Sequence, residues 1–345
     1  MSENTASNAT ASAQAGAVEL DILLDVQHLT KRFAADTNFF GKATSYVQAV
    51  DDVSFQIRKG EAFGLVGESG CGKTTVGKML VNLLKPTSGK IVFDGKELTA
   101  MKPAERKQYC KDIQLIFQDP YASLNPRMTV GEIIKEPMEI HGILDSSKDR
   151  EDRAAELLKT VGLKPDHIRR YPHEFSGGQR QRISIARTLA LNPRFIICDE
   201  PISALDVSIQ AQIINLLKEI QNELGISYLF VAHDLSMVNY ISHRIGVMYL
   251  GHLVEEGPAD QVYEHPIHPY TKALLSAIPI PDPDVAKSRS RIKLEGELPT
   301  PINPPAGCPF KGRCPMATEE CGKSRPEMRD FGGHKAACFY AEAGK

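Results

Sequence analysis

The first patterned part of the chain alternates hydrophobic and polar residues. Residues 23–33 (LLDVQHLTKRF) and 47–57 (VQAVDDVSFQI) carry this alternation, which is the period of a strand with one buried face. Residues 34–46, which lie between them, are expected to form an insertion-like loop. The chain therefore opens with two predicted strands beginning near Leu20.

Continuous apolar runs mark a second group of predicted strands. These runs are AFGLVG (62–67), RFIICDE (194–200), ISYLFVAHD (226–234) and RIGVMYLGHLVEEG (244–257). A helical pattern over 209–224 separates two of the runs, and residues 119–170 are rich in helical patterns. Strands that alternate with helices predict an α/β fold with a parallel sheet at its core.

The two ends differ in composition from this core. Residues 1–19 are mostly small and polar, and we expect a disordered tail there. Residues 278–305 are rich in proline and poor in periodic pattern, which favours an extended connector. A cysteine-bearing segment follows. We therefore expect a main domain over 20–270 and a C-terminal extension over 271–345.

Composition narrows the class of protein. The chain has 345 residues, of which 42% are hydrophobic and 24% charged, and a formal net charge of -2. It lacks the basic character expected of a nucleic-acid-binding surface. No window approaches about 18 consecutive apolar residues, and the N-terminal residues lack the features of a signal peptide. We expect a cytosolic protein whose cysteines are thiols or metal ligands rather than disulfides.

A glycine-rich motif predicts nucleotide binding. GESGCGKTT (67–75) matches G-x-x-x-x-G-K-[ST] between a predicted strand and a predicted helix from about Lys73. Backbone N–H groups would surround the phosphates, Lys73 would neutralise the β- and γ-phosphates, and Thr74 would ligate Mg²⁺. The Cys71 side chain is predicted to be incidental. The expected nucleotide-binding residues are Gly67, Glu68, Ser69, Gly70, Cys71, Gly72, Lys73, Thr74 and Thr75.

Two carboxylates and a second glycine turn complete the candidate chemistry. Asp199 and Glu200 end an apolar run, where one carboxylate can hold Mg²⁺ and the next can polarise an attacking water. HEFSGGQRQRISIARTLA (173–190) predicts a glycine turn that leads into the N-terminus of a helix, an arrangement that binds phosphate. One chain thus carries two candidate phosphate sites.

The ordered set of motifs resembles that of an ABC-type ATPase over residues 20–270. The set consists of the phosphate loop, Gln118 in IFQD, SGGQ (176–179), the acidic pair and His233 in VAHD. The resemblance implies a P-loop NTPase fold with a RecA-like core and a helical subdomain over about 119–180. It also implies ATP and Mg²⁺ as the nucleotide and metal.

The resemblance assigns roles to individual residues. Two nucleotide domains would pack head to tail, so that Ser176, Gly177, Gly178 and Gln179 of one chain meet the γ-phosphate held by the other. Glu200 would be the catalytic base, and His233 and Gln118 would contact the γ-phosphate, with Gln118 also sensing the Mg²⁺ held by Thr74 and Asp199. Asp206 would lie at the dimer seam. Phe33 would stack on adenine or, alternatively, face the core.

Two further stretches narrow the resemblance. FQDPYASLNPRMTVGE and HPYTKALLSAIP resemble the ATPases of bacterial oligopeptide, dipeptide and nickel importers, in particular the second of two non-identical ATPases. This implies a heterodimer with a homologous ATPase and two membrane permeases on which residues 119–170 dock. It also implies an external solute-binding protein, no nucleic-acid partner, and a peripheral place on the cytoplasmic face of the bacterial inner membrane. The cargo, a peptide or another solute, stays open.

Other classes remain as alternatives. A soluble ABC-type ATPase acting on nucleic acid or ribosomes would show a coiled-coil insertion, tandem nucleotide domains or a basic surface, and the sequence shows none of these. A regulator that binds ATP without hydrolysing it conflicts with the presence of Glu200.

Four cysteines in the C-terminal extension have spacings that fit no helix or strand period and suggest shared ligation. They are Cys308, Cys314, Cys321 and Cys338. Iron–sulfur, zinc and free thiols or disulfides are all open, and His334 could complete a Cys₃His zinc site. The resemblance to peptide-importer ATPases implies a [4Fe–4S] cluster. Cys110 and Cys198 are predicted to be ordinary buried residues.

Overall fold

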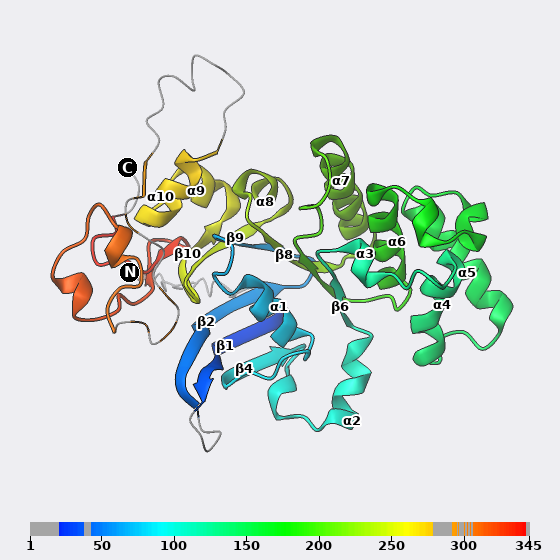
Figure 1. The fold of residues 1–345 in the computed structure, drawn as a ribbon, viewed down its shortest axis with the longest axis horizontal. Coiled ribbons are helices and arrows are strands. Elements are labelled where there is room, and N and C mark those ends of the chain that lie inside the picture. The colour runs from blue at the N-terminus through cyan, green and yellow to red at the C-terminus, as the bar shows by residue number, and fades with distance from the viewer. Residues whose placement is uncertain are drawn as a thin grey trace, which may run out of the picture.

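The computed structural model describes residues 21–37, 43–278 and 306–342, together with residues 292–294, 296, 300, 302 and 304. The predicted tail and most of the predicted connector lie outside these residues. Figure 1 shows a helical lobe at one end of the longest axis, a central body, and the C-terminal extension at the other end.

The elements follow one another as an alternation of strands and helices. The strands are β1 Ile22–Thr37, β2 Ala43–Arg58, β3 Ala62–Val66, β4 Ser88–Phe93, β5 Lys96–Glu97, β6 Ile113–Ile116, β7 Phe195–Asp199, β8 Ser227–Ala232, β9 Arg244–Tyr249, β10 His252–Pro258, β11 Arg329–Asp330 and β12 Lys335–Ala336. The α-helices are α1 Lys73–Leu80, α2 Pro103–Arg106, α3 Pro120–Ser123, α4 Val130–Ile140, α5 Ser147–Thr160, α6 Gly177–Leu189, α7 Val207–Leu224, α8 Leu235–Ile241, α9 Ala259–Glu264 and α10 Pro269–Ser276. Short 3₁₀ helices cover Leu98–Ala100, Lys107–Cys110, Pro165–Arg169, Pro172–Glu174, Lys311–Arg313 and Glu320–Gly322.

The larger sheet forms the core of the protein. Its strand order is β11-β12-β10-β9-β3-β8-β7-β6, and β9, β3, β8, β7 and β6 run parallel. Side chains of β7 alternate between two hydrophobic clusters, with Phe195 and Ile197 in one and Ile196 and Cys198 in the other. Both faces of the sheet are therefore buried, as expected for parallel strands whose sequences are continuously apolar. The predicted α/β class is confirmed.

Two predictions about strands need correction. The expected insertion-like loop over 34–46 is mostly hairpin, because β1 extends to Thr37 and β2 begins at Ala43. The run 244–257 forms two antiparallel strands, β9 and β10, rather than one. A turn at Leu250 and Gly251, both with positive φ, separates them. A continuous apolar run does not reveal such a turn by its hydrophobicity alone.

The helical lobe consists of α3 to α6, and its last helix ends at Leu189, beyond the predicted end of the helical subdomain near residue 180. Thr129 begins α4 with a capping box, in which its hydroxyl accepts from Glu132 N and the Glu132 carboxylate accepts from Thr129 N. A side chain at Gly131 would lie 2.4 Å from Ile168, so the close packing of α4 on the 3₁₀ helix Pro165–Arg169 requires glycine. None of the helices in the described part of the chain combines the length and apolar character needed to cross a membrane.

The cysteine-bearing extension joins the main sheet. Its short strand β12 pairs with β10 at Glu255 and Glu256. The Glu255 side chain is fully buried and accepts hydrogen bonds from Ile267 N at 2.7 Å and His268 N at 2.9 Å. His334 Nε2 lies 2.7 Å from the same carboxylate. A buried carboxylate is stable here because each oxygen has polar partners.

Candidate functional site

The predicted phosphate loop connects β3 to α1. Gly67, Gly70 and Gly72 all have positive φ, a conformation that glycine adopts without steric cost. A side chain at Gly72 would lie 2.2 Å from the carbonyl oxygen of Ala49 in β2, so the loop also needs glycine for its close approach to the hairpin. The sequence pattern thus correctly places a glycine loop between a buried strand and a helix.

Lys73 is held by its own loop. Its Nζ donates to the carbonyl oxygens of Gly67 at 2.7 Å and Glu68 at 3.0 Å and lies 3.7 Å from Cys71 Sγ. The lysine is only 4% exposed. The Cys71 side chain is buried in the core beneath the loop, and burial raises its pKa. That this side chain is incidental to phosphate binding stays a prediction.

Thr74 and Asp199, the predicted Mg²⁺ ligands, are in direct contact. Thr74 Oγ1 donates to Asp199 Oδ1 at 2.8 Å, and Asp199 is 5% exposed. Burial raises the pKa of Asp199, so the buried anion would be stabilised by a nearby cation. Among the described residues no three His, Cys, Asp and Glu side chains form a group that could hold a metal ion. That does not conflict with Mg²⁺, which commonly takes one or two protein oxygens and completes its shell with phosphates and water.

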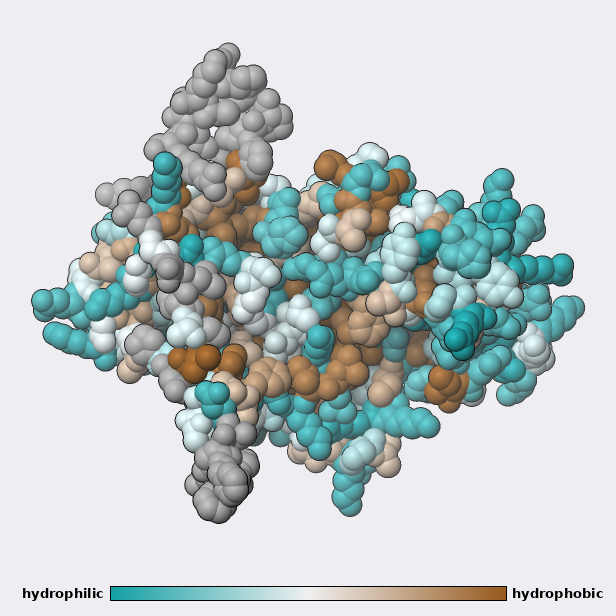
Figure 2. Space-filling view, in the orientation of Figure 1, coloured by the Kyte–Doolittle hydropathy of each residue, from teal (hydrophilic) through white to brown (hydrophobic). Residues whose placement is uncertain are grey.

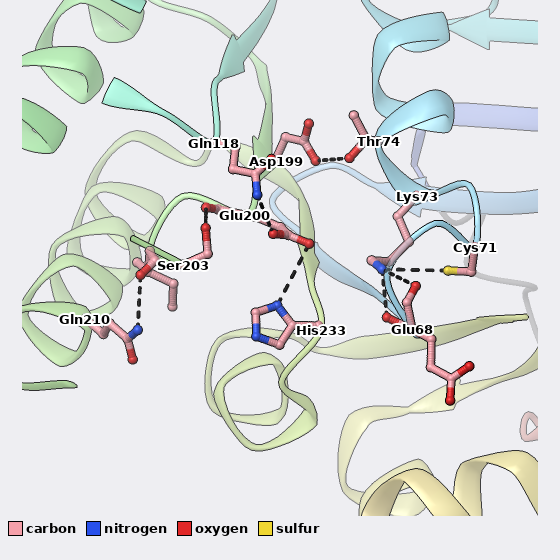
Figure 3. A network of polar contacts seen from close by, with 12 residues as sticks. Glu68, Cys71, Lys73, Thr74, Gln118, Asp199, Glu200, Ser203, Gln210 and His233 are labelled. Carbon is pink, nitrogen blue, oxygen red and sulfur yellow. Dashed lines mark hydrogen bonds and ion pairs between the residues drawn. The ribbon is translucent and has the colours of Figure 1, made fainter. Parts of the chain in front are cut away.

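Glu200 is contacted from two sides (Figure 3). Gln118 Nε2 donates to Glu200 Oε2 at 2.8 Å, and His233 Nδ1 lies 3.9 Å from Glu200 Oε1. Glu200 itself has φ of 47°, a left-handed conformation that is uncommon outside glycine and marks functional turns. The structure therefore brings three predicted catalytic residues together beyond the end of β7.

The turn after Glu200 has its own supports. Ser203 Oγ donates to the Glu200 carbonyl oxygen at 3.1 Å. Gln210 Nε2, from α7, donates to the carbonyl oxygens of Ile202 at 3.1 Å and Leu205 at 3.0 Å. Neither Ser203 nor Gln210 was predicted from the sequence. Both residues occupy ordinary helix or turn positions, so no local signal distinguishes them.

The second glycine turn lies away from the phosphate loop of the same chain. Figure 1 shows α6, which begins at this turn, well separated from α1. Ser176 caps α6, because its hydroxyl accepts from Gln179 N at 3.4 Å and its N–H donates to Gln179 Oε1 at 3.1 Å. Gly177 and Gly178 thus stand in the first turn of a helix, where backbone N–H groups lack partners within the helix.

The second glycine turn packs against the turn that carries Asp206. A side chain at Gly178 would lie 2.5 Å from Ile209 of α7, and one at Gly177 would lie 3.3 Å from Leu205. Asp206 is exposed and caps α7, accepting from Ser208 Oγ at 2.8 Å and Ile209 N at 3.1 Å. The hydrogen bond from Ser208 holds the pKa of Asp206 below its usual range. The two turns predicted to face a second chain therefore lie next to each other, with Ser176 and Asp206 exposed.

Phe33 lies on the hairpin beside the phosphate loop. It pairs with Val47 of β2 and is 37% exposed, with Lys31 Nζ 5.0 Å from the ring centroid. Ala49, two residues after Val47 in β2, lies close to the phosphate loop, because a side chain at Gly72 would meet the Ala49 carbonyl oxygen. The alternative that Phe33 is buried in the core is not supported, because its ring is accessible.

Comparison with known proteins decides the family. Residues 50–203 match the family model described as "ABC transporter", and residues 254–321 match "Oligopeptide/dipeptide transporter, C-terminal region". The putative oligopeptide transport ATP-binding protein YkfD of Bacillus subtilis is 58% identical over 92% of this chain and 94% of its own length. The chain belongs to the ATP-binding proteins of ABC transporters.

Two further comparisons agree with this assignment. The oligopeptide transport ATP-binding protein OppF of Escherichia coli is 52% identical over 92% of this chain and 96% of its own length. A dimeric ATP-binding cassette solved with ADP and Pi bound has a TM-score of 0.61 and 29% identity over 69% of this chain and 99% of that one. This ABC transporter ATPase is therefore an ATP hydrolase coupled to transport. None of these matches supports a nucleic-acid or ribosome ATPase.

Two residues of the ABC transporter ATPase contact its phosphate loop from outside the predicted site. Tyr270 of α10 accepts a hydrogen bond from Glu68 N at 2.9 Å through its hydroxyl. Arg313 of the extension donates to the Glu68 carboxylate, with Nη1 2.9 Å from Oε2 and Nη2 3.3 Å from Oε1. The sequence offered no signal for either contact, because each joins segments more than 200 residues apart.

The four cysteines of the extension line one small cavity. Burial, with the nearby thiols of Cys314, Cys321 and Cys338, raises the pKa of Cys308 to about 11. The four cysteines therefore lie close to one another, whereas their predicted role as shared ligands stays a prediction. In the described part of the chain, however, no group that could hold a metal ion is formed. The thiols share a cavity without the arrangement of a metal site.

Two other predictions about ligands and cysteines are wrong. His334 does not line the thiol cavity, and its Nε2 is engaged with the Glu255 carboxylate, so it is not the fourth ligand of a zinc site. Cys110 is exposed rather than buried, since it ends a short 3₁₀ helix on the surface. Cys198 is fully buried in β7, as predicted.

Proposed function

We propose that this chain is the ATP-hydrolysing subunit that powers the import of oligopeptides. The observation that carries this proposal is the match of residues 254–321 to the oligopeptide/dipeptide transporter region in a chain that also matches an ABC transporter ATPase. Relatives that align with 92% of the chain bear oligopeptide transport in their names. As an ABC transporter ATPase, the chain acts with membrane permease subunits.

The proposed hydrolytic site uses the residues gathered around the ends of β3 and β7. Lys73 and the loop amides bind the phosphates, and the Glu200 carboxylate accepts a proton from the attacking water. Gln118 and His233, which contact Glu200, orient that carboxylate and the water. Thr74 and Asp199 would hold Mg²⁺, which supplies charge neutralisation to the phosphates when bound.

The proposed partner in hydrolysis is a second, homologous ATPase. Support comes from the place of α6, which begins at Gly177 and lies well apart from α1, the helix that follows the phosphate loop of the same chain (Figure 1). Helix N-termini attract anions through unpaired N–H groups. ATP would thus lie between the loop of one subunit and the α6 N-terminus of the other. We propose a heterodimer, whose second subunit contributes its own glycine turn.

The proposed permease contact is an apolar groove between α1 and the helical lobe. A cavity of about 620 Å³ lies there, lined among others by the ends of α1 and α4. Leu83, Phe117 and Ile140 border it and are 59%, 39% and 63% exposed. Figure 2 shows apolar side chains gathered in the middle of this face. An exposed apolar patch in a hollow is typical of a protein-binding site. The groove would place the chain peripherally on the cytoplasmic face of the membrane.

The proposed occupant of the thiol cavity is an iron–sulfur cluster. Its support is the convergence of Cys308, Cys314, Cys321 and Cys338 on one cavity, because four thiolates are the usual ligand set of [4Fe–4S]. The thiols are not arranged as a metal site in this structure, so binding would require their side chains to rearrange around the cluster. A bound cluster would supply a crosslink to an extension that has few regular elements.

The function is tested by transport. The chain is combined with its permeases, a second ATPase and the solute-binding protein in proteoliposomes, and uptake of labelled di-, tri- and longer peptides is measured with and without ATP. We expect ATP-dependent uptake of peptides. Uptake of a nickel chelate in the absence of any peptide uptake would contradict the assigned cargo and leave the ATPase assignment unaffected.

A further inference from the structure

An ion pair joins the cysteine-bearing extension to the phosphate loop. Arg313 makes a two-pronged contact with the Glu68 carboxylate, at 2.9 and 3.3 Å. The Arg313 side chain is 11% exposed and the Glu68 side chain 28% exposed, so the pair is largely shielded from water. Paired hydrogen bonds between a guanidinium and a carboxylate are directional and hold both groups in one orientation.

Glu68 is held at its backbone as well as its side chain. Its N–H donates to the Tyr270 hydroxyl at 2.9 Å, and its carbonyl oxygen accepts from Lys73 Nζ at 3.0 Å. Together with Arg313, these contacts engage every polar group of the residue. Because Lys73 takes part of its support from the Glu68 carbonyl, the position of Glu68 affects the position of the lysine that binds phosphate.

Arg313 and Tyr270 both lie next to one packed cluster of aromatic rings. The rings of Tyr249 and Tyr270 lie 4.7 Å apart, and Phe310 packs on them at 5.2 and 5.5 Å. Phe310 is 1% exposed and also lines the thiol cavity. The short 3₁₀ helix that ends at Arg313 follows it directly. The segment that carries Arg313 is therefore held in place by the packing of Phe310, three residues earlier.

We propose that Arg313 is a positioning residue for ATP binding, acting through Glu68 on the phosphate loop. It has two effects. It fixes the loop in the shape that surrounds the phosphates, and it neutralises a carboxylate that would otherwise repel them. Because both effects act on bound ATP before and during hydrolysis, they lower the Kd and KM for ATP and leave kcat nearly unchanged.

The direct test measures ATP affinity in the full-length chain by equilibrium binding of a fluorescent ATP analogue. Arg313→Ala is expected to raise Kd about tenfold, since a shielded charge pair is lost and Glu68 is left unneutralised. Lys323→Ala removes an exposed basic residue of the same extension and should leave Kd unchanged. Unchanged affinity in Arg313→Ala would overturn the proposal. The measurement needs no transport, so it stands apart from the identity of the cargo.

A comparison of Arg313→Ala with a double variant distinguishes a loss of positioning from general damage to the fold. Glu68→Gln removes the charge that Arg313 neutralises, so the double variant Glu68→Gln/Arg313→Ala should bind ATP more tightly than Arg313→Ala alone. The defect of Arg313→Ala should also shrink at high salt, which screens the unpaired carboxylate. A purely structural role predicts that the double variant binds no better than the single one and that salt has no effect, and either result would reject the proposal.

Discussion

Gln118 and Glu200 are joined by a hydrogen bond of 2.8 Å between Nε2 and Oε2, although 82 residues separate them in the chain. Gln118 follows β6, at the entrance to the helical lobe, whereas Glu200 follows β7. The proposed general base is thus connected to the lobe that carries the proposed permease groove. A movement of that lobe would change the surroundings of Glu200, so the proposed permease contact would have a direct route to the proposed hydrolytic site.

Glu200→Gln should lower ATP turnover by roughly a hundredfold or more while ATP binding persists, because removal of a general base typically costs this much. Phosphate release and binding of labelled ATP measure the two properties. Glu219→Gln makes the same substitution at an exposed site on α7 and should change neither. Turnover near the original rate in Glu200→Gln would remove this residue from its assigned role.

Gly178→Ala should impair hydrolysis through packing. The added methyl group would lie 2.5 Å from Ile209, which forces α6 away from α7. We expect kcat of Gly178→Ala in the assembled complex to fall about tenfold. The kcat of Gly177→Ala should fall less, because the nearest contact of its added methyl group would be at 3.3 Å. Adding Ile209→Ala should restore activity to Gly178→Ala. Absence of such rescue would mean that Gly178 acts otherwise than through this contact.

Ile140→Asp should prevent association with the permeases. A charge in the apolar groove would be desolvated on docking, which we expect to weaken binding by at least about tenfold. Co-purification of permeases measures the effect, and ATP binding should be unchanged. Leu224→Asp, at an exposed apolar residue that does not line the groove, serves as the control. Equal loss of permeases in both variants would contradict a specific groove.

Metal analysis tests the thiol cavity. Under strictly anaerobic purification we expect a brown protein with about four irons per chain. Cys308→Ser should lose most of the iron, and Cys110→Ser, at an exposed cysteine outside the cavity, should lose none. Stoichiometric zinc without iron would contradict the iron–sulfur proposal.

Stability should depend on pH through His268. Burial lowers the pKa of His268 from 6.5 to about 4, although the nearby Glu255 carboxylate opposes this. Between pH 4 and pH 6.5 the unfolded chain binds a proton at this histidine that the folded chain does not. The contribution of neutral His268 to the free energy of unfolding is therefore complete above pH 6.5 and is lost as the pH falls towards 4. The full effect is roughly 3 kcal/mol.

Thermal unfolding between pH 4 and pH 7 measures this dependence. His268→Asn keeps a side-chain acceptor at the start of α10 and should flatten the fall in melting temperature at acid pH. His265→Asn, at an exposed histidine nearby, should not. Parallel curves for the three proteins would show that His268 does not govern acid stability.

The sequence predicted those parts of the site whose residues lie together in one short stretch of the chain. The phosphate loop needs glycine at fixed intervals, and the acidic pair follows a buried strand, so both were recognisable within about ten residues. The hairpin extending into the expected loop, and the exposure of Cys110, depend on how segments pack. Arg313 and Tyr270 were missed for the same reason, because nothing in HPYTK or KGRC indicates that either segment contacts Glu68.

The segment from Cys308 to Arg313 contacts two neighbours at once: its first residue and Phe310 line the thiol cavity, and its last residue pairs with Glu68. Inserting or deleting a single residue between them would take one of these groups out of reach of its partner. Although its regular structure is limited to one short 3₁₀ helix, this segment should therefore tolerate changes of length poorly when such proteins are engineered or joined to other domains.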